Sequence, residues 1–202
     1  MSNKEDKFLE ALRLFTNEVC EAGQAADGAL RGIGDMSNAL ERVTQAKRNC
    51  RDQREVLTEK LYKVYKGTGK MTEARSFISK AYGVVNQLKE LLYLLDTVQV
   101  GQMPEELRAL SELMGAALLE MQKIMAYTVD VKANFMKIEA RSRKIYTLEE
   151  RGDTCIRECL RLFYGGNQDP MYVLYWKDIM HGLEQILDGV AGMVMPLQKM
   201  VG

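Results

Sequence analysis

The feature that most constrains the fold is the scarcity of helix-breaking residues between long runs of helix-forming sequence. The chain has 202 residues and only 3 prolines. Two of these, Pro104 and Pro170, stand where a helix would begin, and Asp169 is a suitable N-cap residue before the second. The expected breaks fall at residues 32–35, 67–69, 100–104 and 165–170. This spacing predicts long helices joined by short connections.

Between these breaks the apolar residues recur with a helical period and show no sustained alternation, so no strand is predicted. Two stripes are clear, one formed by Phe135, Ile138, Ile145, Ile156, Leu160 and Phe163, and the next by Trp176, Ile179, Leu183, Leu187 and Val190. A further break is expected near residues 128–131, which gives six helices. Pro196 is expected to kink or end the last helix. The predicted fold class is all-α.

The two halves of the chain also resemble each other. The segment 61–67 aligns with 160–166, and Gly83 aligns with Gly182. The offset is 99 residues in both cases, since 160 − 61 and 182 − 83 give the same value. We therefore predict two pseudo-repeated three-helix halves, residues 1–101 and 102–202, that form one long bundle.

Composition excludes several classes of protein. Acidic and basic residues number 28 each, so the net charge is zero and no nucleic-acid partner is expected. The N-terminal residues are charged and lack a signal-peptide core, and no uncharged apolar run reaches the roughly 18 residues of a membrane span. The 4 cysteines form no CxxC pair and are expected to be reduced thiols. These features predict a cytoplasmic protein.

The candidate functional residues are two acidic pairs in the last two predicted helices. Glu149 and Asp153 lie four positions apart beside one apolar stripe, and Glu184 and Asp188 repeat the spacing beside the next. This spacing places both carboxylates of a pair on one helix face, about 6 Å apart along the axis. Two adjacent helices with such pairs assemble an oxygen-rich site for a divalent or iron-type metal ion. Solvated acidic pairs that bind nothing are the alternative.

Other residues of this region are secondary candidates. Asp178 and His181 are added as metal ligands, because His181, the only histidine, precedes Glu184 by three positions on the same face. A half-exposed histidine without a ligand is the alternative. A basic cluster is interpreted either as a solvated helix face or as a surface for an acidic partner or a membrane. Its members are Lys137, Arg141, Arg143 and Lys144.

A family resemblance rests on a series of short motifs: Glu149–Asp153, Leu160–Phe163, Asp169–Pro170, Trp176–Ile179, Leu183–Asp188 and Val190–Ala191. Over residues 130–195 this series resembles the second half of the PhoU-like, Pit-accessory family of phosphate-transport regulators. The resemblance implies two three-helix bundles with ExxxD motifs that hold metal ions on the bundle surface. It also implies metal ligation by the four carboxylates of the acidic pairs.

The function that the resemblance implies is regulation of inorganic phosphate transport by protein contact. The expected partner is a phosphate transporter or its regulatory partner, which would place the protein at the inner face of the inner membrane. A homo-oligomer is a further expectation. No catalytic motif or nucleophile–base arrangement is found, so the chain is predicted not to be an enzyme. The alternatives are a ferritin-like carboxylate metalloenzyme and a metal-free helical scaffold.

The first half departs from the family pattern. At the offset of 99 residues the four candidate ligands align with Cys50, Arg54, Val85 and Lys89, none of which is a carboxylate. We therefore expect metal in the C-terminal half alone. A more speculative prediction is that Arg54 and Lys89 together form an anion pocket suited to phosphate.

Overall fold

A computed structural model describes residues 3–98, 103–166 and 168–202 of the chain, and within them the fold is all-α, without a strand. This confirms the predicted class. The α-helices are α1 (Asn3–Leu30), α2 (Met36–Tyr65), α3 (Lys70–Thr97), α4 (Glu105–Tyr127), α5 (Val131–Gly165) and α6 (Pro170–Val201), with a 3₁₀ turn at Thr128–Asp130. Within the described residues no helix has the length and apolar character needed to cross a membrane.

The expected count of six separate helices is not met, because α4, the 3₁₀ turn and α5 follow one another without a loop. If α4, the turn and α5 are counted as one continuous run, the described chain contains five helical segments and not six. The break lies at Asp130, whose backbone leaves helical geometry (φ −139°, ψ 88°) and whose side chain caps α5 by accepting a hydrogen bond from the amide of Ala133. Just before it, Thr128 donates a hydrogen bond to the carbonyl of Met125. The break lies where the sequence placed it, but neither glycine nor proline is needed to make it.

The other helix ends agree with the predicted breaks, as far as the described residues cover them. Asp169 caps α6 and accepts hydrogen bonds from the amides of Met171 and Tyr172 at 2.7 and 3.2 Å. Pro196 was predicted to kink or end the last helix, and the second alternative is wrong because α6 continues to Val201. Pro196 lies inside α6 and is buried, so its packing against the core offsets the one backbone hydrogen bond that proline cannot donate.

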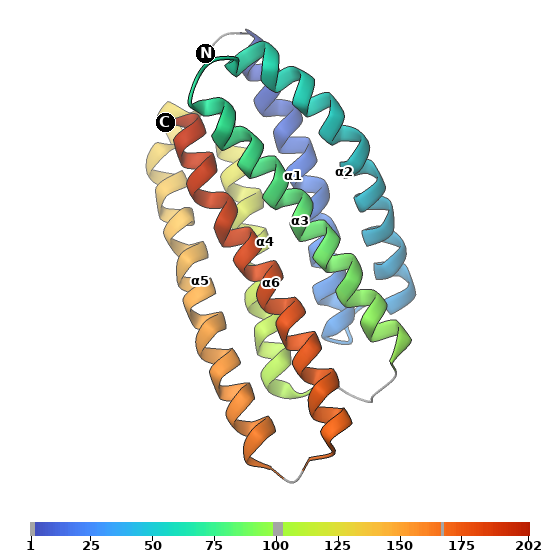
Figure 1. The fold of residues 1–202 in the computed structure, drawn as a ribbon. Coiled ribbons are helices and arrows are strands. Elements are labelled where there is room, and N and C mark those ends of the chain that lie inside the picture. The colour runs from blue at the N-terminus through green and yellow to red at the C-terminus, as the bar shows by residue number, and fades with distance from the viewer. Residues whose placement is uncertain (1–2, 99–102, 167) are drawn as a thin grey trace.

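The helices form an elongated bundle in which consecutive helices run in opposite directions (Figure 1). Helices α1, α2 and α3 pack on one another, as do α4, α5 and α6, while α1 packs on α4 and α3 on α6. Buried residues from all six helices form a single apolar core. The two halves predicted from the sequence therefore share one hydrophobic interior.

The α3–α6 contact depends on glycines of α6. A Cβ atom on Gly182 would lie 3.0 Å from Leu91, and one on Gly189 would lie 2.8 Å from Val84. The two contact points are seven residues apart on each helix, and the position advances along α6 while it goes back along α3, as in an antiparallel helix pair. Gly83, the predicted counterpart of Gly182, has no such neighbour, because a Cβ there would meet nothing within 4 Å. The two glycines that align in sequence are thus not equivalent in packing.

Most residues of the predicted apolar stripes lie in the core, Leu160 is half-buried against it, and Phe135 is exposed. All five stripe residues of α6, from Trp176 to Val190, are buried, and so are Ile138, Ile145, Ile156 and Phe163 of α5. Phe135 instead is 52% exposed. It is rotated by about 60° from Ile138 around the helix axis and lies in the second turn of α5, near the end of the bundle.

Candidate metal centre

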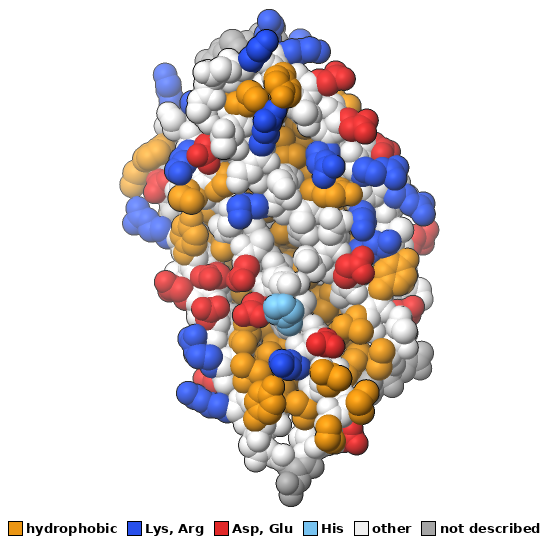
Figure 2. All heavy atoms as spheres, viewed as in Figure 1, with side chains coloured by type: hydrophobic (Ala, Val, Ile, Leu, Met, Phe, Trp, Pro, Cys, Tyr) orange, Lys and Arg blue, Asp and Glu red, His pale blue; other side chains and the backbone are white. Residues whose placement is uncertain are grey.

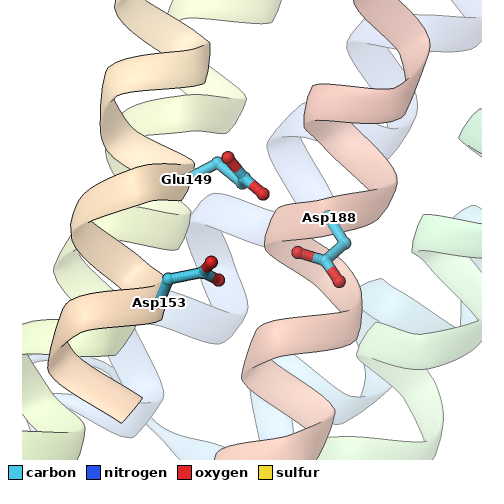
Figure 3. A group of neighbouring side chains, drawn as sticks. All are labelled: Glu149, Asp153 and Asp188. Carbon is cyan, nitrogen blue, oxygen red and sulfur yellow. The ribbon is translucent and has the colours of Figure 1, made fainter. Parts of the chain in front are cut away.

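Three of the four predicted ligands form a carboxylate cluster between α5 and α6. Glu149 and Asp153 project from α5 toward Asp188 on α6, and Figure 3 shows the three groups facing one another. One oxygen from each lies within 4.8 Å of the others. Glu149 and Asp153 are half-buried and Asp188 is exposed. On the surface, Asp and Glu side chains gather beside the single histidine (Figure 2).

Close packing of the two helices brings these carboxylates together. Gly152, the residue before Asp153, is buried, and a Cβ atom added to it would overlap Leu187 Cδ2. Leu187 in turn is the residue before Asp188 and is 1% exposed. The apolar contact beneath the cluster therefore sets the separation of the two helix faces that carry Asp153 and Asp188.

The electrostatics of the cluster favour a bound cation. Partial burial raises the pKa of Glu149, and the neighbouring charges of Asp153, Asp188 and Glu150 raise it further. Desolvation by the neighbouring helix surface likewise raises the pKa of Asp188, although its side chain is exposed overall, and the charges of Glu184 and Asp153 add to the effect. A cation between these carboxylates would remove the mutual repulsion. Carboxylate oxygens at this spacing suit hard divalent ions and iron.

Glu184, the fourth predicted ligand, lies outside the cluster. One of its carboxylate oxygens lies 3.1 Å from Nδ1 of His181. It was placed with Asp188 because residues four apart share a helix face, but the histidine one turn earlier on α6 draws its carboxylate away. Its charge still acts on Asp188, whose pKa it helps to raise.

His181 is engaged at both ring nitrogens. Nδ1 contacts Glu184 at 3.1 Å, and Nε2 lies 3.0 Å from the side-chain amide nitrogen of Gln185. A neutral ring satisfies both contacts if Nδ1–H donates to the carboxylate and Nε2 accepts from the amide. In this arrangement the lone pair that a metal requires is already used. The prediction of His181 as a ligand is therefore not supported by its geometry.

Asp178 lies apart from the cluster. It is ten residues before Asp188 on α6, about 15 Å along the helix axis. There it lines a largely apolar pocket together with Leu94, Val98 and Leu174. As a ligand of the same ion as Asp188 it is too distant.

The N-terminal positions aligned with the ligands have other roles. Cys50 and Val85 are buried in the core. The guanidinium carbon of Arg54 lies 4.5 Å from the ring centre of Tyr82, and Lys89 Nζ lies 4.9 Å from that of Tyr93. Within the described residues each of the two cations thus stacks on a different aromatic ring. The pairing of Arg54 and Lys89 as an anion pocket stays a prediction.

The sequence reasoning missed Glu120, a buried acid at the α4–α5 contact that is only 2% exposed. Its two oxygens accept hydrogen bonds from Lys123, Arg141 and Lys144 at 3.1, 2.9 and 2.8 Å. A signal was present: Glu120 falls between Ala117 and Ile124 on the apolar stripe of α4, where a charge must be paired. Two members of the predicted basic cluster are its partners.

Comparison with known proteins adds no family assignment: no protein-family model matches the chain, and no curated protein matches its sequence.

Proposed function

We propose that this protein is a non-catalytic regulator of phosphate transport that binds a divalent or iron-type metal ion through Glu149, Asp153 and Asp188. The observation that carries the metal site is the convergence of three carboxylates from two helices within 4.8 Å. Like charges at this distance repel one another unless a cation or protons compensate them. Glu184 would adjust the field at Asp188 without binding the ion directly.

The proposed role in phosphate transport rests on the motif resemblance of residues 130–195 to PhoU-like, Pit-accessory proteins. In keeping with it, we propose a PhoU-like pair of pseudo-repeated three-helix bundles, with the metal-binding motif kept in the second bundle alone. The protein would work in the cytoplasm, peripheral to the inner membrane and as a homo-oligomer, through contact with a phosphate transporter or its regulatory partner. The metal would stabilise the α5–α6 face and need not take part in a reaction.

Metal analysis of protein purified without chelators tests the site. Wild type should hold divalent metal or iron, and Asp153→Asn with Asp188→Asn should lose most of it while remaining helical. Asp178→Asn is the matched control, because it removes the same charge from α6 outside the cluster. Equal metal content in wild type and the double variant would overturn the ligand assignment.

The regulatory role needs a separate experiment in cells. We expect the tagged wild-type protein to co-purify with membranes that contain a phosphate transporter, to different extents at high and low phosphate. Absence of any transporter from the purified complexes under both conditions would exclude the proposed role. That result would not bear on the proposed metal site, which the metal analysis tests separately.

A further inference from the structure

A second charged centre lies on the other side of α5, where α5 packs on α4. Glu120 is buried there, and its oxygens accept hydrogen bonds from Lys123 of α4 and from Arg141 and Lys144 of α5. The cations are more accessible than the acid: their side chains are 38%, 35% and 53% exposed, against 2% for Glu120. Three positive groups are thus held around one negative charge, with their outer sides toward solvent.

The charges in this centre do not balance. One carboxylate compensates one cation, which leaves an excess of two positive charges among groups that all contact the same acid. A fourth cation, Lys137, lies nearby with its Nζ 5.3 Å from the ring centre of Tyr127. Burial alone would raise the pKa of Glu120, but hydrogen bonds from Lys144, Lys123 and Arg141 outweigh it and lower the pKa. The acid therefore stays charged at neutral pH and keeps the cations together.

The cations retain hydrogen-bond donors that Glu120 does not use. Arginine has five N–H donors and a protonated lysine has three, whereas each contact to Glu120 engages one nitrogen atom of its cation. The planar N–H fork of an arginine and the ammonium groups of two lysines can together donate hydrogen bonds to the oxygens of a phosphate group. A structural ion pair would need only one of these cations.

We propose that Arg141, Lys144 and Lys123 form a binding site for a phosphate-type oxyanion on the α4–α5 face, with Glu120 as the buried residue that positions them. Glu120 is a positioning residue, since it lies beneath the cations and would not touch the anion. The ligand is either inorganic phosphate or the phosphate group of a lipid headgroup, because both present the same oxygens. This goes beyond the proposed metal site, which lies between α5 and α6, and does not depend on it.

Calorimetric titration with inorganic phosphate, in buffer with a chelator to exclude metal-bound phosphate, tests the site. Wild type should bind, and Arg141→Gln with Lys144→Gln should bind at least tenfold more weakly, because two charge-assisted contacts are lost. Arg143→Gln is the matched control, since it removes the same charge from an exposed position of α5 and should change affinity less than twofold. Lys144→Gln alone keeps the test valid if the double variant does not fold.

Glu120→Gln separates an anion site from a purely structural ion cluster. It replaces the charge that holds the three cations together by a neutral amide at nearly constant shape, so phosphate should bind about five- to tenfold more weakly although Glu120 does not touch the anion. Circular dichroism would check that each variant remains helical. Unchanged or tighter binding by Glu120→Gln would overturn the proposal, as would equal phosphate affinity in wild type and the Lys144→Gln variant.

Vesicle binding identifies the source of the phosphate group. If inorganic phosphate gives no heat, phosphatidylcholine vesicles containing phosphatidic acid should bind wild type, and vesicles of phosphatidylcholine alone should not. Binding should then be lost with Arg141→Gln and Lys144→Gln and retained with Arg143→Gln. If wild type binds neither free phosphate nor phosphatidic acid, the proposal is refuted, whatever the metal content of the protein.

Discussion

Gly152 of α5 lies so close to Leu187 of α6 that a Cβ atom at residue 152 would overlap the terminal methyl group Cδ2 of the leucine. The next residue on each helix is a member of the carboxylate cluster, Asp153 on α5 and Asp188 on α6. The apolar contact between Gly152 and Leu187 in the core therefore sets the distance between the carboxylates of Asp153 and Asp188 at the surface.

Gly152→Ala should therefore weaken metal binding as well as the fold. The added methyl group must push Leu187 or the whole of α6 away, which we expect to cost about 1–3 kcal/mol of unfolding free energy. The same displacement separates Asp153 from Asp188, so metal affinity should fall by about tenfold or more. Chemical denaturation and a metal titration measure the two effects on the same protein.

Gly182→Ala is the control for Gly152→Ala. It places a Cβ atom 3.0 Å from Leu91, so it disturbs α6 at its contact with α3 and away from α5. We expect a loss of stability without a comparable loss of metal affinity. If both variants lower metal affinity equally, the effect comes from general loosening of α6 and not from the Gly152–Leu187 contact.

Removing two of the clustered charges should make the metal-free protein at least as stable as wild type. Burial and mutual repulsion already raise the pKa of Glu149 and of Asp188, so Asp153→Asn with Asp188→Asn relieves repulsion in the apo state. Wild type should instead gain about 2.7 kcal/mol from metal at 100 times its dissociation constant. Thermal melts with and without metal should show a shift in wild type only; a similar shift in the double variant would contradict the assignment.

Glu120 should make stability depend on pH in the acid range. Hydrogen bonds from Lys144, Lys123 and Arg141 lower its pKa below the usual 4.5 despite burial. A carboxyl group with a lowered pKa in the folded state stabilises the fold above its unfolded pKa, and this contribution is lost as pH falls through the folded pKa. The free energy of unfolding of wild type, measured in urea, should therefore fall progressively below about pH 4.5.

Comparison with Glu120→Gln isolates this contribution from those of other acids. The variant should be less stable than wild type at pH 7 by roughly 1–3 kcal/mol, because a neutral amide replaces a charged acceptor of three hydrogen bonds. The difference between the two proteins should shrink toward zero as the pH is lowered. A difference that stays constant from pH 7 to pH 3 would show that Glu120 does not titrate with a lowered pKa.

Local patterns predicted most helix ends because breaking or capping residues stand there. Asp169 before Pro170 predicted the start of α6, and the structure shows the predicted cap. Pro196 misled because the cost of proline in a helix is local, whereas the core packing that offsets it is a tertiary property. The sequence also did not show that a 3₁₀ turn, and not a loop, joins α4 to α5, because such a turn has no strong sequence signature.

For the candidate site, the sequence could predict which carboxylates share a helix face, but not which of them meet across two helices. Spacing placed Glu149 and Asp153 together correctly, but the same rule could not tell that His181 would engage Glu184. The approach of α5 to α6 depends on Gly152, whose role follows from what faces it and not from its own sequence neighbourhood. Glu120 was overlooked because its partners on α5 are more than twenty positions away in sequence.

The sequence paired Arg54 with Lys89 as a possible anion pocket. In the structure the exposed guanidinium of Arg54 instead lies over the ring of Tyr82, 4.5 Å from its centre. An exposed contact of this kind is worth about 0.5–1 kcal/mol. Arg54→Ala and Tyr82→Leu should each lose this interaction, and the double variant should lose it only once, as a double-mutant cycle by chemical denaturation would measure.

Phosphate affinity decides between the two cation groups. Arg54→Ala should bind inorganic phosphate as wild type does, because Arg54 lies on α2 over the ring of Tyr82, outside the α4–α5 cluster. Arg141→Gln, a change of the same charge on α5, should weaken binding severalfold because that residue contributes donors beside Glu120. If calorimetry shows the reverse, with binding lost in Arg54→Ala and kept in Arg141→Gln, then the anion site lies on α2 and α3 and the α4–α5 cluster is structural.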